Sequence, residues 1–115
     1  MLSLLPSLAA AADDEAQLSA LREKIVEMIG SAPCVNLVHC RLLPLGSLPC
    51  GGPAEYLAFS RITGSQDALE NLATEYTLLD EDIQRAKSEM GICRALPKPR
   101  LACVDGRCRV EAAEP

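Results

Sequence analysis

Six cysteines are the strongest constraint on this chain of 115 residues. They all lie beyond the apolar N-terminus, at Cys34, Cys40, Cys50, Cys93, Cys103 and Cys108. An even number of cysteines in so short a chain is typical of an exported domain that is held by disulfides. With one Phe and no Trp, the chain has little material for a large core, so we expect covalent links to contribute much of its stability.

The first twelve residues differ in composition from the rest. Leu2 to Ala12 is apolar and ends in alanines before the acidic Asp13, as in the part of an export signal that precedes its cleavage site. We expect residues 1–12 to be a signal-like or disordered N-terminus and residues 13–115 to form one domain, which is secreted or periplasmic. No later stretch reaches the roughly 18 apolar residues of a membrane span.

Two helices are predicted. Between Gln66 and Met90, apolar side chains recur at spacings of three and four, which places them on one face; they are Leu69, Leu72, Tyr76, Leu79, Ile83, Ala86 and Met90. We interpret this stripe as a core face and expect a monomer, with a homodimer seam as the alternative. A shorter helix is expected from about Glu15 to Ile29.

The remaining elements are predicted to be strands. Val35 to Leu45 and Tyr56 to Ile62 have the composition of strands, and a loop rich in Pro and Gly separates them. Within Leu101 to Val110, Asp105-Gly106 is a strong hairpin turn. The predicted class is therefore α+β, a small disulfide-linked domain in which one long and one shorter helix pack on an antiparallel sheet.

The cysteine positions favour one bridge and leave two open. A bridge from Cys50 to Cys93 is preferred, because it would tie the end of the long helix to the second strand. Cys103 and Cys108 flank the Asp-Gly turn, so they are placed either to pair with each other or to reach Cys34 and Cys40. A pair between Cys34 and Cys40 is too long in an extended strand, so it would require Val35 to His39 to be looped. The sequence does not choose between these alternatives.

The segment Cys-Gly-Gly-Pro-x-x-Tyr-Leu, which runs from Cys50 to Leu57, resembles one found in small exported bacterial proteins of unknown function. The likeness extends over about residues 34–110 and includes the closing segment from Cys103 to Cys108. It implies export and disulfide bonding, and it implies no activity.

Charge changes sign along the chain. Acidic residues prevail between residues 65 and 90, whereas arginines and lysines prevail between residues 91 and 110. We interpret these as the solvated face of a helix and a solvated hairpin, rather than as a surface for nucleic acid or anionic lipid, because exposed aromatic residues are scarce. We expect no nucleic-acid partner.

Catalytic patterns are missing from the sequence. The single histidine, His39, lies in an apolar run beside Cys40 and is interpreted as a strand residue. A zinc site built from His39 and the cysteines around it is the less favoured alternative, since the Cys-x-x-Cys spacing is absent. We therefore expect no enzyme, no cofactor and no metal.

The function favoured by elimination is a secreted or periplasmic binding or inhibitory module of the cell envelope, whose protein partner the sequence does not identify. Its candidate binding loop comprises Leu45, Gly46, Ser47, Leu48, Gly51 and Gly52. The alternatives are a structural or assembly protein that uses the helix stripe, and a protein that handles thiols or metals.

Overall fold

The computed structural model describes residues 6–87 and 95–112, with side chains from residue 13 onward. Two helices, α1 (Pro6–Ile29) and α2 (Gln66–Lys87), accompany four strands. The strands form two antiparallel hairpins, β1 (Cys40–Leu45) with β2 (Glu55–Ser60), and β3 (Arg100–Val104) with β4 (Arg107–Glu111). Short 3-10 turns, η1 (Leu37–His39) and η2 (Arg61–Thr63), precede β1 and follow β2. The α+β class and the predicted order of elements are confirmed.

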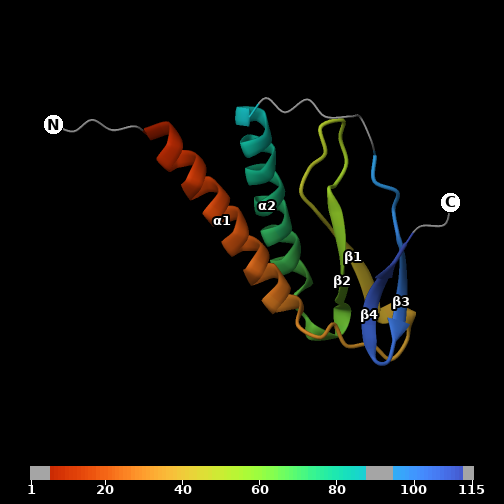
Figure 1. Ribbon diagram of the computed structural model, residues 1–115. Helices are drawn as coiled ribbons and strands as arrows, with labels where there is room; N and C mark the ends of the chain where they lie inside the picture. The colour runs from red at the N-terminus through yellow and green to blue at the C-terminus, as the bar shows by residue number, and fades with distance from the viewer. Residues whose placement is uncertain (1–5, 88–94, 113–115) are drawn as a thin grey trace.

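The β1–β2 hairpin is the middle layer of the molecule (Figure 1). Its register pairs Cys40 with Ser60 at one end and Leu45 with Glu55 at the other. Because side chains alternate between the faces of a strand, Leu43 and Leu45 point to the helices, whereas Cys40 points to the β3–β4 hairpin. The two helices and the second hairpin thus cover opposite faces of the first.

The main core lies between the helices and the β1–β2 hairpin. Its buried members come from four elements, and they are Ile25, Leu43, Leu45, Phe59, Leu69 and Ala73. Three residues of the predicted α2 stripe contribute to this core, since Leu69 is a buried member and Leu72 and Tyr76 pack around the cluster. Ile83 is buried outside this cluster. Ala86 is exposed, and Met90 lies outside the described residues.

The first helix is longer than expected. The described part of α2 ends at Lys87, and residues 88–90 of its predicted range lie outside the described residues. α1 has 24 residues. It begins at Pro6 rather than near Glu15, and it runs through Asp13 and Asp14, which were expected to precede it. Alanine is the best helix former, and Pro is tolerated in a first turn; both favour this earlier start.

The expected single sheet is two separate two-stranded sheets. Disulfides join them, because Cys34 is bonded to Cys103 and Cys40 to Cys108. This is the alternative in which the segment before β1 reaches across to the C-terminal hairpin. Cys103 and Cys108 are opposite each other in the β3–β4 register. They are not bonded to each other, because each forms its disulfide with Cys34 or Cys40. Cys93 lies outside the described residues, so its bridge to Cys50 stays a prediction.

The β3–β4 turn has the predicted conformation. Asp105 and Gly106 both have positive φ, 53° and 76°, as a two-residue type I′ turn requires. Around the turn, the backbone N–H of Cys34 donates to the carbonyl of Gly106, and that of Cys108 donates to the carbonyl of Ala32. The hairpin is therefore fixed to the segment before β1 by hydrogen bonds as well as by disulfides.

Leu69→Ala tests whether the α2 stripe is core. Leu69 is fully buried, so we expect a loss of about 2 to 5 kcal/mol in the free energy of unfolding. Leu78→Ala is the matched control on the same helix, because its side chain is 56% exposed, and we expect a change within about 0.5 kcal/mol. Urea denaturation measures both, and equal losses would contradict this core.

Removal of the two bridges should not be additive. Each closes a loop of about 70 residues, which corresponds to about 4 kcal/mol in the chain-entropy model. While one bridge remains, however, the other closes a ring of only about 12 residues and contributes about 3 kcal/mol. We therefore expect each double Cys→Ser variant to lose about 3 kcal/mol, and the fourfold variant to lose more than their sum. If removal of the first disulfide costs as much as removal of the second, the two bridges do not close one small ring as described.

Candidate functional site: a pocket between the β1–β2 loop and α2

The loop that joins β1 to β2 lies beside α2 and encloses a pocket with it. The pocket has a volume of about 670 Å³. Apolar side chains of β1, the loop and α2 line one part of it, and they are Leu42, Leu43, Pro44, Pro53 and Ala73. Loop backbone and polar side chains of α2 line the rest, namely Gly46, Ser47, Gly51, Gly52, Glu70, Thr74, Thr77 and Glu81.

Three polar side chains of α2 hold the first part of the loop. Thr77 Oγ1 accepts a hydrogen bond from the N–H of Gly46 at 3.0 Å, and Asp80 Oδ2 accepts one from the N–H of Ser47 at 3.0 Å. Gln84 Nε2 donates both to Asp80 Oδ2 and to the carbonyl of Ser47. The loop's backbone groups are thus satisfied by the helix, which fixes the pocket wall.

Gly46 is required at the point where the chain leaves β1. Its φ is +76°, and an added Cβ would lie 3.0 Å from Asp80 Oδ2 and 3.1 Å from the Cβ of Ala54. Beyond it, the loop closes on itself, since Gly51 N–H donates to the carbonyl of Leu48 and Leu48 N–H donates to that of Gly52. The loop side of the pocket is therefore ordered by the close packing of Gly46 against Asp80 and Ala54 as well as by hydrogen bonds.

The charge in the pocket is negative. Glu70 and Glu81 are its charged lining residues, and Asp80 lies just behind Gly46. Tyr76 is on the same helix, and burial, with a further contribution from Asp80, raises its pKa above the usual value. A lining that combines apolar side chains with carboxylates suits a ligand that has a cationic head and an apolar stem, such as a lysine or arginine side chain.

An ion pair fixes the far end of the loop. Arg22 of α1 donates to both carboxylate oxygens of Glu55, at 3.1 and 3.0 Å. The hydrogen bond to Glu55 raises the pKa of Arg22. Because Glu55 is the first residue of β2, this bidentate contact ties the strand that leaves the loop to α1. Both helices therefore position the loop.

Only four of the six residues of the predicted binding loop line the pocket. Gly46, Ser47, Gly51 and Gly52 line the pocket. Leu45 is fully buried in the core, so it packs the domain and has no surface for a partner. Leu48 is half-buried and is not among the lining residues.

Sequence reasoning missed the α2 side of the pocket. Glu70, Thr74, Thr77 and Glu81 follow one another at helical spacing, so they share a face next to the core stripe. That spacing is visible in the sequence. It does not distinguish a pocket wall from an ordinary solvated face, because both are polar.

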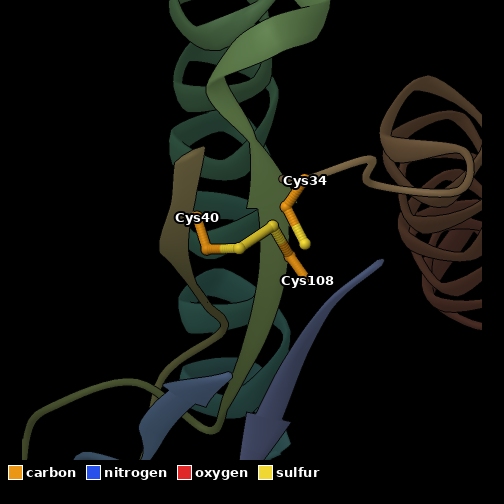
Figure 2. Close-up of side chains that lie close together, drawn as sticks. All are labelled: Cys34, Cys40 and Cys108. Atoms are coloured by element: carbon orange, nitrogen blue, oxygen red, sulfur yellow. A yellow bond between two sulfur atoms is a disulfide. The ribbon is translucent and has the colours of Figure 1, made fainter. Parts of the chain in front are cut away.

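Cys34, Cys40 and Cys108 form a second cluster, at the joint of the hairpins. Figure 2 shows the sulfur of Cys34 beside the bridge from Cys40 to Cys108, and the sulfurs of these three buried residues lie within 4.8 Å of one another. All three are in disulfides, and a disulfide sulfur lacks the thiolate that binds a metal. In this state the cluster is a covalent joint.

His39 is not the strand residue that was expected. It lies in η1, because the side chain of Asn36 accepts a hydrogen bond from Val38 N–H and starts a 3-10 turn there. Its Nδ1 accepts a hydrogen bond from the backbone N–H of Val35 at 3.0 Å. The histidine therefore closes the turn between Cys34 and Cys40.

In the part of the chain that the structure describes, neither helix has the length and apolar character needed to cross a membrane. The disulfides are consistent with an extracellular or other oxidising compartment.

Comparisons with protein-family models, with curated proteins and with solved structures find no match to this chain. The resemblance to small exported bacterial proteins therefore stays a prediction.

Gly46→Ala tests the close approach of the loop to α2. The matched control is Gly64→Ala, because Gly64 has a similar φ of +72° but open space around it. Both variants carry the cost of a left-handed alanine, about 1 to 2 kcal/mol, and Gly46→Ala should lose further stability through its contacts with Asp80 and Ala54. Urea denaturation compares the two, and equal losses would show that the loop does not depend on this contact.

Proposed function

We propose that this protein is a non-enzymatic binding or inhibitory module of the cell envelope, secreted or periplasmic, which holds a basic side chain of a partner protein in the pocket beside α2. The observation that carries the proposal is the pocket itself, whose lining combines apolar side chains with the carboxylates of Glu70 and Glu81. Preformed cavities of this kind, with few polar groups that fix orientation, are typical of binding sites.

The order of the pocket supports a recognition role. The loop is held from both helices, by Thr77, Asp80 and Gln84 on one side and by Arg22 on the other. A wall that is fixed before binding loses little conformational entropy when a partner arrives. The cationic preference follows from Glu70 and Glu81, because charge complementarity selects the partner and speeds its association.

The two alternatives receive less support. An assembly role through the α2 stripe would need an accessible stripe, but Leu69 and Ile83 are buried within the chain. Thiol or metal handling would need reducible or free cysteines, and the cysteines around the joint of the hairpins are paired and largely buried.

Glu81→Lys tests the proposal directly. Glu81 lines the pocket, so reversal of its charge should weaken the binding of short peptides that carry one lysine or arginine between apolar residues by roughly tenfold or more, which is about 1.4 kcal/mol. Fluorescence anisotropy with labelled peptides measures the affinity. Acidic and uncharged peptides of the same length are the comparison set.

The matched control is Glu75→Lys, which makes the same change in net charge on the same helix at an exposed position outside the pocket. It should bind basic peptides almost as well as the original protein, and both variants should melt like it. An equal loss in both variants would mean nonspecific attraction to an acidic protein. No preference for basic peptides would overturn the proposal.

A further inference from the structure

An exposed aliphatic surface lies at the end of the molecule opposite the pocket loop. Val35, Leu37 and Val38 are 82%, 53% and 65% exposed. They lie in and just before η1, between Cys34 and Cys40, whose disulfides fix both ends of this segment. We call these three residues the aliphatic tip.

Neighbouring segments extend the apolar surface at this end. η1 lies against β3, which ends at the partly exposed Val104. The exposed Ile62 belongs to η2, which follows Ser60, the register partner of Cys40. Figure 1 places η1, η2 and the β3–β4 turn together at one end of the β1–β2 hairpin, and the β1–β2 loop at the other. Apolar side chains held together in water usually mark a contact surface.

Arginines surround the tip. Arg41 Nη1 donates to the carbonyls of Val38 and Cys40, so its guanidinium lies at the tip itself. Arg107 is in a β-bridge with Pro33, two residues before Val35. Arg61 begins η2, directly after the register partner of Cys40.

The local charge at this end is opposite to that of the whole chain. Residues 33–41, 61–63 and 104–107 carry three arginines and one acidic residue, Asp105, which gives 3 − 1 = +2 with His39 neutral. The chain as a whole carries −5. The local balance of charge is therefore positive where the aliphatic side chains are exposed.

We propose that this end docks on an anionic phospholipid surface, with the aliphatic tip inserted at the interface and Arg41, Arg61 and Arg107 at the level of the headgroup phosphates. Short aliphatic side chains next to basic ones bind such surfaces through two additive contributions, apolar burial and attraction to anionic lipid. From the sequence alone the basic hairpin was interpreted as solvated. The structure adds the exposed aliphatic residues beside it, and this combination favours lipid over an acidic protein or a second copy of the chain.

The docking is interfacial and does not require a spanning helix. The tip is a short 3-10 turn held by disulfides, so it would enter only the headgroup boundary and would keep its fold there. Insertion of a rigid turn needs little ordering of the chain, which lowers the entropy cost of binding.

Vesicle flotation tests the proposal with the full oxidised chain. We expect the protein to float with vesicles of phosphatidylcholine and phosphatidylglycerol, and to float far less with vesicles of phosphatidylcholine alone. Raised salt should weaken the binding, because headgroup attraction is screened. Equal flotation with both vesicle types, or none with either, would overturn the proposal.

Two pairs of variants separate the contributions. Leu37→Ser with Val38→Ser should lower partitioning to the anionic vesicles by at least about tenfold, whereas Leu78→Ser removes a leucine of similar exposure from α2 and should leave it unchanged. Arg61→Gln with Arg107→Gln should lower it by about fivefold per arginine, whereas Arg85→Gln, an exposed arginine of α2, should change it little. Circular dichroism and thermal melting verify that every variant is folded.

The oligomeric state gives the remaining control. Light scattering of the protein without lipid should give the mass of a monomer. A dimer that the Leu37→Ser and Val38→Ser pair converts to a monomer would show that a second copy covers the tip, and it would overturn lipid docking. Equal flotation of the tip variants and of Leu78→Ser would overturn it as well.

Discussion

The two disulfides that join the segment before β1 to the C-terminal hairpin are the constraint on which the rest of the structure depends. The β3–β4 hairpin has one buried residue among those the structure describes in it, Cys108. An isolated two-stranded hairpin is at best marginally stable in water, and this one brings little apolar surface to the joint. The cluster beneath it consists of Ala32 and three cysteines, so the bridges supply both the links and much of the packing. They also fix the turn that carries the aliphatic tip.

α2 stabilises the fold and builds the pocket with different faces. Leu69 and Ala73 pack in the core, while Thr77, Asp80 and Gln84 satisfy the backbone of the β1–β2 loop. The loop is rich in Gly and Pro and has few apolar groups to bury, so hydrogen bonds to a rigid helix contribute to its order, together with the disulfide of Cys50. The pocket is therefore a consequence of how the loop is stabilised, and its acidic character follows from the polar face that α2 turns toward it.

Local patterns in the sequence predicted the local parts of the structure. The apolar spacing of Leu69, Leu72 and Tyr76 located α2, and Asp105-Gly106 located the second hairpin, because both signals act between residues close in sequence. The choice of cysteine partners depends on which hairpin lies against which, and no short-range signal carries that information. The 3-10 turn at Leu37–His39 was missed for another reason. Its apolar residues have the composition of a strand, but the cap provided by Asn36 and the link to the C-terminal hairpin favour a turn.

The separation of the two surfaces allows them to act independently. The β1–β2 hairpin has six residues in each strand, and at about 3.4 Å per residue it spans roughly 20 Å. This is more than twice the Debye length of about 8 Å at physiological ionic strength. Repulsion between anionic headgroups and Glu81, which adjoins the loop contact of Asp80, would therefore be largely screened when the opposite end is docked. Glu70 lies in the second turn of α2, nearer the docked end. The same span would hold the β1–β2 loop and the C-terminal half of α2 clear of the lipid, where a basic segment of a partner protein can reach them.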